Sequence, residues 1–183
     1  LGGMSWPDMD MLPFGVISSP NSGRLPYRNT SLTHDEQRSQ MTLWAIVKSP
    51  LMFGGAATQL DAFTMGLLAN REVLEMNAKS TDNRRVNSSS AHAVWAAKAS
   101  GDWSYVGLFN RLASTTTLTT SFASLGLQSD QDYDSIDLWT GKTAVQSDGK
   151  VSVSVAPHGV ALLKLAECAK SGRALLVERG GAR

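Results

Sequence analysis

The chain has little cysteine and little histidine. Cys168 is the only thiol among 183 residues, and the three histidines are dispersed without the spacing of a metal-binding pair. One thiol cannot form an intrachain disulfide, and no C-x-x-C pair is present to hold zinc. Cys168 also has no obvious base partner nearby in the sequence, so it is a poor candidate nucleophile. We therefore expect no metal ion and no other cofactor.

Excess charge of one sign is missing too, as are long hydrophobic runs. The 17 basic residues balance 16 acidic ones, for a net charge of +1. Binding to nucleic acid or to an anionic membrane surface favours a basic excess, so we expect neither partner. No run of about 18 apolar residues occurs, which argues against a membrane span. With 42% hydrophobic and 18% charged residues, the chain should fold around a core.

The N-terminus lacks both an initiator methionine and a signal peptide. The chain opens on Leu1, and a candidate site motif follows almost at once, at residues 6–12. We expect that the front of a larger protein is missing, so the absent signal peptide says little about location. The N-x-S sequons at Asn29 and Asn87 favour a secretory route weakly, with ordinary polar loops as the alternative.

The first 80 residues read as alternating loop, helix and strand. Residues 13–32 are rich in proline, glycine, serine and asparagine and indicate a long irregular loop. Thr33 and Glu36 form a capping box at a helix start, and Pro50 ends that helix. The apolar run 51–53, followed by two glycines, is typical of a buried parallel strand. The predicted helices cover residues 33–48, 61–68 (capped by Asp61) and 71–76.

The second half reads as an antiparallel β-sandwich. The polar stretch 80–90 is interpreted as an interdomain linker. Asp148-Gly149, followed by alternating valines, predicts a β-hairpin. The predicted strands are 92–99, 103–110, 115–121, 135–138, 151–155 and 160–165. The resulting domains are 1–86, 87–166 and a polar tail at 167–183.

Residues 6–12, which read WPDMDML, are the first functional candidates. Asp8 and Asp10 lie two residues apart, so an extended backbone would point both carboxylates to one side. Carboxylates accept hydrogen bonds from hydroxyl groups, and the neighbouring Trp6 and Met11 can cover the carbon faces of a polyhydroxylated ligand. The alternative is that both aspartates are turn or capping residues.

Tryptophans elsewhere have two interpretations. Trp44 is expected in the core, packed from its helix against the first domain. Trp103 and Trp139 are expected in the sandwich, with an exposed platform for a sugar as the alternative.

The order of several motifs resembles glycoside hydrolase family 27, the α-galactosidase or melibiase group. Members carry W-N-D-P-D-M-L, where this chain has Pro7 in place of the asparagine and Met9 in place of the proline. Residues 43–52, LWAIVKSPLM, resemble the helix that follows in the family. Residues 70–77, NREVLEMN, and residues 155–163, VAPHGVALL, resemble two later segments. The likeness spans about residues 2–165.

The resemblance implies the last βα units of a TIM (β/α)₈ barrel, followed by a C-terminal antiparallel β-sandwich. It implies a retaining glycosidase that uses two carboxylates, a nucleophile and an acid/base. In the family those aspartates lie in segments that this chain does not contain, so we assign no catalytic residue here. Asp10, Met11, Asp8 and Trp6 are assigned to substrate binding, with Asp10 accepting sugar hydroxyls and Met11 lining the pocket.

The expected partner is a galactose-containing oligosaccharide or glycoconjugate, and a homodimer is left open. The family also implies an extracellular, cell-wall or vacuolar-lysosomal location. Close alternatives are an α-N-acetylgalactosaminidase or a β-L-arabinopyranosidase, which share the galacto arrangement of hydroxyls. Two further alternatives are a non-catalytic carbohydrate-binding product and an interaction module built on the β domain. The chain alone is expected to be inactive.

Overall fold

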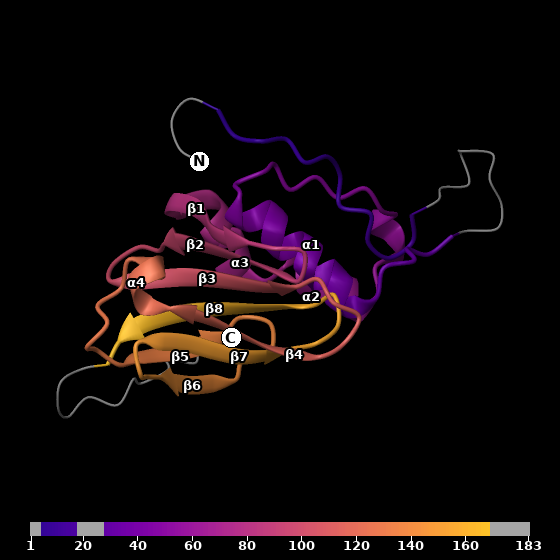
Figure 1. The fold of residues 1–183 in the computed structure, drawn as a ribbon. Coiled ribbons are helices and arrows are strands. Elements are labelled where there is room, and N and C mark those ends of the chain that lie inside the picture. Colours follow the sequence, from indigo (N-terminus) through magenta and orange to yellow (C-terminus); the bar gives the residue numbers. More distant parts are fainter. Residues whose placement is uncertain (1–4, 18–27, 169–183) are drawn as a thin grey trace.

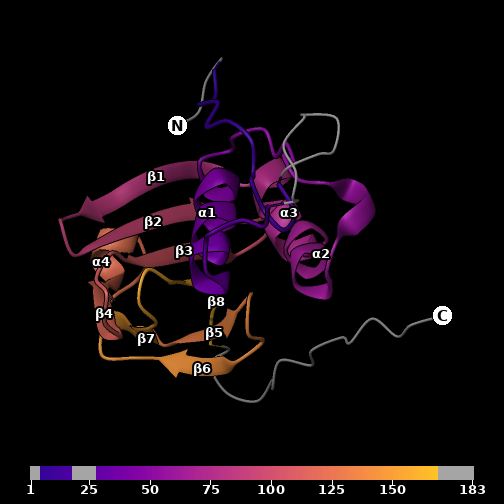
Figure 2. The ribbon, with the colours of Figure 1, turned by 90° about the vertical axis from the view of Figure 1, so that its right-hand side faces the viewer.

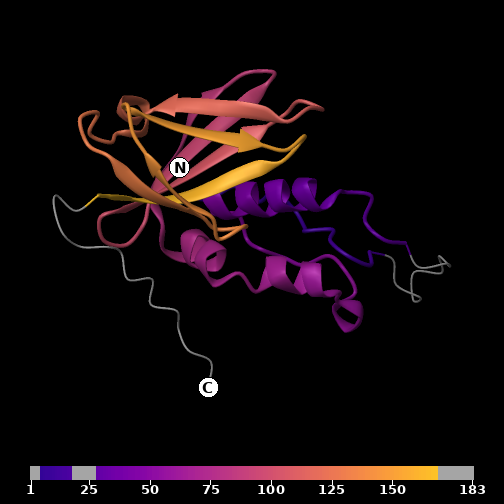
Figure 3. The same ribbon diagram turned by 90° about the horizontal axis from the view of Figure 1, so that it is seen from below.

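The computed structural model describes residues 5–17 and 28–168. Figure 3 shows the N-terminal helices on one side of a large sheet and a small two-stranded sheet on the other. The helices are α1 (His34–Ile46), the 3₁₀ turn η2 (Ala57–Gln59), α2 (Ala62–Leu68), α3 (Arg71–Lys79) and α4 (Phe122–Leu125). The strands are β1 (Thr81–Ser88), β2 (His92–Lys98), β3 (Trp103–Asn110), β4 (Thr116–Ser121), β5 (Tyr133–Asp137), β6 (Thr143–Gln146), β7 (Lys150–Val155) and β8 (Val160–Glu167).

The three predicted N-terminal helices are confirmed, together with the two predicted caps, at Thr33 and Asp61. The hydroxyl of Thr33 accepts from the Glu36 amide at 3.2 Å, and the Glu36 carboxylate accepts from the Thr33 amide at 2.7 Å. Asp61 caps α2 by accepting from the Thr64 amide at 2.7 Å. Asn70 caps α3, which continues to Lys79 rather than ending near residue 76. Each cap satisfies an amide that lacks a partner within its own helix.

The linker predicted at residues 80–90 is wrong, because most of it is strand β1. This strand pairs antiparallel with β2 along its length and thereby crosses the predicted domain boundary at 86/87. It is polar because it is the edge strand of the sheet and most of its side chains face solvent. Register shifts between Thr81 and Arg84 and between Arg85 and Asn87 also break the alternation that would reveal a strand.

The sandwich is built from two antiparallel sheets. The large sheet has the order β1-β2-β3-β8-β5-β6, and β4 pairs with β7 in the small sheet (Figures 1 and 2). The six predicted strands are confirmed within about two residues of their ends, whereas β1, β6 and the short α4 were not predicted. Strand β6 is short and mostly exposed, so it carries little hydrophobic signal.

The turn at Asp148-Gly149 exists, but the predicted hairpin does not. Both residues adopt positive φ, 55° and 67°, as a tight turn of this kind requires. However, β6 before the turn pairs with β5, and β7 after it pairs with β4 in the other sheet. The turn therefore carries the chain from one sheet to the other.

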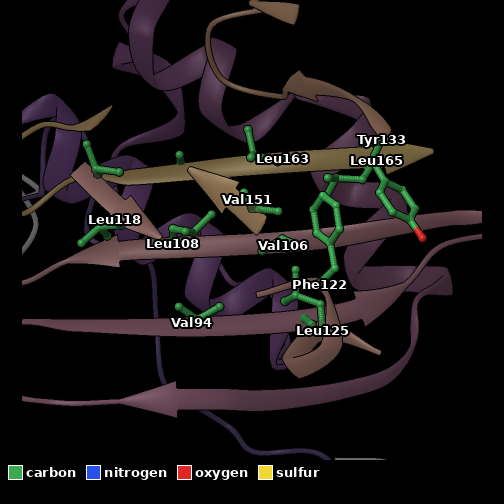
Figure 4. Packing of buried hydrophobic residues seen from close by; sticks show 13 residues of the cluster. Val94, Val106, Leu108, Leu118, Phe122, Leu125, Tyr133, Val151, Leu163 and Leu165 are labelled. Carbon is green, nitrogen blue, oxygen red and sulfur yellow. The ribbon is translucent and has the colours of Figure 1, made fainter. Parts of the chain in front are cut away.

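Two hydrophobic cores share the large sheet. The first lies between the two sheets and includes Val94, Val106, Phe122, Val151 and Leu163 (Figure 4). The second lies between the opposite face of the sheet and the N-terminal region. Because side chains alternate along a strand, Tyr105 and Leu162 enter the second core while their neighbours enter the first. Strand β3 is covered on both faces, which explains why residues 105–110 are all buried.

The N-terminal region contains a remnant of parallel pairing. Leu12 forms a parallel bridge with Phe53, and the Leu12 amide donates to the Met52 carbonyl at 2.8 Å. The fully buried strand predicted at 51–53 is wrong in that Met52 is 46% exposed. This stretch pairs through a single bridge, so its outer side stays open to solvent. The predicted tail begins inside β8, which ends at Glu167, and its residues 169–183 lie outside the described residues.

Candidate functional site

Residues 6–11 do not run straight, because the backbone turns sharply at Asp10. Its φ of 70° lies in the left-handed region, so the prediction that the segment is extended throughout is wrong at this residue. The Asp10 amide donates to Asp8 Oδ1 at 2.9 Å, and the Met11 amide donates to Asp10 Oδ1 at 2.6 Å. One carboxylate oxygen of each aspartate therefore accepts a hydrogen bond from a backbone amide within the turn. Both side chains remain exposed and present their second oxygens at the surface.

Met11 and Leu12 diverge at the start of the parallel bridge. Leu12 is fully buried, whereas Met11 is 54% exposed. Met11 lies over Gly54, where an added Cβ would meet Met11 Cβ at 3.0 Å and its sulfur at 3.4 Å. The glycine thus leaves room for the methionine side chain. Met11 consequently provides an exposed apolar surface next to the Asp10 turn.

Trp6 lies beside a cation that the sequence did not single out. The Lys48 ammonium sits 5.3 Å from the centre of the Trp6 ring, which is 43% exposed. Lys48 also donates to the carbonyls of Ala78 and Ser80, at 3.2 and 3.0 Å, and so caps the end of α3. Burial lowers the pKa of Lys48. The cation therefore links Trp6 to the helical layer.

Two further residues hold the motif in place. Trp44 of α1 donates from its indole Nε1 to the Asp10 carbonyl at 2.8 Å. Ser49, fully buried just after α1, accepts at its hydroxyl oxygen from the Met9 amide at 3.0 Å. Trp44 was predicted in the core, and it does pack against the second core, but its polar atom reaches the candidate site. Sequence patterns report apolar spacing and not the direction of an indole N–H, so this contact could not be read in advance.

A separate apolar groove of about 600 Å³ lies between the N-terminal segment, α1, β2 and β3. Pro7 and Met9 line it, whereas Asp8 and Asp10 do not. Successive residues of the motif thus face different sides. The groove is therefore distinct from the surface that carries the two carboxylates.

The other candidate residues make contacts that support the fold. Trp103 is half-buried beneath the Lys164 ammonium at 5.3 Å, and the indole of Trp139 donates to Thr42 at 2.8 Å, so these two tryptophans are not an exposed platform. His34, one of the three dispersed histidines, stacks on Phe63 with ring centres 3.6 Å apart. Burial, with the nearby Asp134 charge, raises the pKa of Cys168. Within residues 5–17 and 28–168, no three metal-ligating side chains gather, and no helix there is long and apolar enough to cross a membrane.

Two family models match the chain in sequence order. Residues 5–79 match the model described as alpha galactosidase A, and residues 89–165 match the alpha galactosidase C-terminal beta sandwich domain. The first match contains the whole WPDMDML motif and all three N-terminal helices. The second begins at the residue after β1 and ends within β8.

Individual relatives agree with these matches. An α-galactosidase of Cyamopsis tetragonoloba is 32% identical over 155 residues, which cover 84% of this chain and 34% of the relative. An α-galactosidase of Oryza sativa subsp. japonica is 30% identical over the same shares of the two chains. The chain thus spans about a third of the length of these relatives.

Solved structures share the fold. A β-L-arabinopyranosidase of family 27 from Geobacillus stearothermophilus superposes with a TM-score of 0.83 at 34% identity, over 92% of this chain and 38% of that one. α-Galactosidase I from Mortierella vinacea gives 0.74 at 26% identity, over 91% and 41%. These structures establish the fold class predicted above, the closing βα units of a TIM barrel joined to an antiparallel β-sandwich. The chain belongs to glycoside hydrolase family 27.

Proposed function

We propose that this chain supplies the galactose-binding rim of a retaining α-galactosidase that cleaves terminal α-D-galactosides. The carrying observation is the turn at Asp10, which presents carboxylate oxygens of Asp8 and Asp10 next to the exposed Met11, with Asp8 two residues after the exposed Trp6. Ionised carboxylates accept hydrogen bonds from adjacent sugar hydroxyls, and the thioether and indole can cover carbon-bound hydrogens. The segment also lies inside the region matched by the alpha galactosidase A model.

The two catalytic carboxylates belong, in this proposal, to segments of the enzyme outside these 183 residues. A retaining glycosidase needs a nucleophile and an acid/base about 5–5.5 Å apart. Asp8 and Asp10 each hold a backbone amide within the turn, and this suits fixed acceptors for hydroxyl groups better than groups that attack or exchange protons. The chain alone should therefore bind sugar without turning it over.

The proposal is tested by titrating the 183-residue chain with D-galactose and following its amide resonances by NMR. D-Glucose, which differs in configuration at one carbon, is the control. Shifts at Asp10 and Met11 with galactose, weaker with glucose, are expected. No shift with either sugar would contradict the proposal. A chromogenic α-galactoside completes the test, because turnover by this chain would overturn the placement of the catalytic pair elsewhere.

A second candidate substrate is a β-L-arabinopyranoside. The observation that favours it is the TM-score of 0.83 and 34% identity to the Geobacillus enzyme. L-Arabinopyranose shares the galacto hydroxyl arrangement and lacks the hydroxymethyl group. Tighter binding of L-arabinose than of D-galactose in the same titration would favour this candidate, and the reverse order would favour the α-galactosidase.

We also propose a secretory route, to the cell exterior or to a vacuolar-lysosomal compartment. The support is the exposure of both sequon asparagines, Asn29 before α1 and Asn87 on the edge strand β1. Expression through a eukaryotic secretory pathway should yield a chain whose mass falls on treatment with an N-glycosidase. Asn87→Gln should remove one glycan, whereas Asn83→Gln, outside any sequon, should leave glycosylation unchanged. An unmodified wild-type chain would contradict the proposal.

A further inference from the structure

Asp10 adopts a conformation that an aspartate does not favour without support. A non-glycine residue with φ of 70° is uncommon, and such residues persist only when their surroundings hold them. Two local bonds shape the turn: the Asp10 amide donates to Asp8 Oδ1, and the Met11 amide donates to Asp10 Oδ1. Both come from exposed side chains that water can compete for. A contact from the folded body of the protein is needed to fix the turn in one position.

Trp44 makes that contact. Its indole N–H donates to the carbonyl of Asp10 at 2.8 Å across 34 positions of sequence. The indole packs against the second core, and its helix is held by the Thr33 capping box and by contacts with α3 and the large sheet. The donor is therefore anchored on a rigid element. It fixes the orientation of the Asp10–Met11 peptide unit.

Three polar groups of Asp10 each have a different hydrogen-bond partner. Its amide is bound by Asp8, its carbonyl by Trp44, and its Oδ1 by the Met11 amide. This leaves Oδ2 as the carboxylate oxygen to meet a ligand hydroxyl. Rotating the Asp10–Met11 peptide away from Trp44 would redirect both the carboxylate and the Met11 side chain.

We propose that Trp44 is a positioning residue for sugar recognition, whose indole N–H locks the Asp10 turn and so aims Asp10 and Met11 at the galactoside. The inference rests on the proposed function, because it assumes that this turn is the sugar-binding surface. Trp44 itself need not touch the sugar.

The test is a pair of matched variants. Trp44→Phe removes the donor to Asp10 and keeps an aromatic ring in the core. Trp139→Phe is the control, because it removes an indole N–H that donates to Thr42 on the same helix, also at 2.8 Å. Replacing Trp44 by β-(3-benzothienyl)alanine, which has the shape of tryptophan and sulfur in place of N–H, separates loss of the bond from loss of packing.

Two readouts are used on the 183-residue chain: the amide resonances of Asp10 and Met11 without sugar, and the affinity for D-galactose. Trp44→Phe and the benzothienyl chain should shift both amides and weaken galactose binding about tenfold, the scale of one lost hydrogen bond. Trp139→Phe should do neither. Unchanged resonances and unchanged affinity in the benzothienyl chain would overturn the proposal.

The two proposals fail differently. If wild-type chain does not bind galactose, the proposed function fails, while the amide shifts without sugar still report whether Trp44 holds the turn. If wild-type chain binds galactose and both Trp44 replacements bind equally well, the positioning role fails and the proposed function stands. Weakened binding in Trp139→Phe to the same extent would also overturn the specific role of Trp44.

Discussion

Tyr105 lies in the second core with only 1% of its surface exposed. Burial, reinforced by the negative charges of Glu72 and Glu75, raises the pKa of Tyr105 to about 12. An unfolded tyrosine titrates near pH 10. Between these values the folded chain keeps the phenolic proton that the unfolded chain has lost. Stability contributed by the neutral phenol is thus complete below about pH 10 and is lost as the pH rises toward 12.

Tyr105→Phe removes this titration and should flatten the alkaline part of the stability profile. Urea unfolding at several pH values between about 8 and 12, followed by circular dichroism, measures the effect. The slope of the unfolding free energy against pH should be similar for wild type and variant below pH 10. Above pH 10 the slope should be steeper for wild type. Parallel profiles across the whole range would show that Tyr105 titrates normally.

The sequence predicted which residues make up the candidate site, but not the conformation of its backbone. The spacing of Asp8 and Asp10 marked the segment, and its apolar neighbours suggested a sugar ligand. The left-handed φ of Asp10 could not be inferred, because aspartate is only modestly enriched there compared with glycine. The bonds from Trp44 and Ser49 join residues tens of positions apart, and they appear only once α1 is placed beside the motif.

Among the elements, α1 depends on its capping box. Thr33→Ala should lower the free energy of unfolding by about 1 kcal/mol, the usual cost of losing an N-cap hydroxyl. Ser31→Ala, at an exposed position before the cap, is the control and should change stability little. Chemical unfolding at neutral pH measures both. Equal stability of the two variants would mean that the box contributes nothing to this helix.

The same box should make α1 sensitive to acid. Hydrogen bonds from the Thr33 amide and hydroxyl lower the pKa of Glu36. Its contribution is therefore present above the unfolded value of about 4.3 and is lost as the pH falls through the lower folded value. Glu36→Gln keeps an acceptor oxygen and removes the titration, so its stability should vary less with pH between about 5 and 3. The comparison requires unfolding curves of both chains across that range.

Elements with strong local chemistry were predicted well, and polar elements were not. Helix caps at Thr33 and Asp61 are local signals, and they placed α1 and α2 correctly. Strand β1 looked like a linker because an edge strand can be polar on both sides. The turn at Asp148-Gly149 was predicted correctly. However, β7 pairs with β4, some thirty positions earlier, and a local turn signal carries no information about that pairing.

For the whole molecule, the β half should be unstable without the helical layer. A polypeptide of residues 80–168 would expose Tyr105 and Leu162, which are 1% and 0% exposed in the full chain. Apolar burial contributes about 25 cal/mol per Å², so uncovering this face lowers stability and leaves an apolar patch. A polypeptide of residues 88–168 lacks β1 as well and should be weaker still.

Urea midpoints of the two polypeptides and of the full chain should therefore rank in the order 88–168, then 80–168, then the full chain. Gel filtration in parallel would detect association through the uncovered face. A chain of residues 88–168 as stable as the full chain would support an autonomous β module instead, the interaction-module alternative.

The second core also bears on how such proteins can be recombined. The two family models leave a gap between residues 79 and 89 that looks like a natural crossover point. Yet Met41 and Val73 from one side of the gap share a core with Tyr105 and Leu162 from the other. A chimera that joins the β-sandwich of one family member to the barrel of another at this point would bring together two half-interfaces shaped for different partners. A stable chimera should therefore take the sheet residues that face α1 and the helices from the same parent protein.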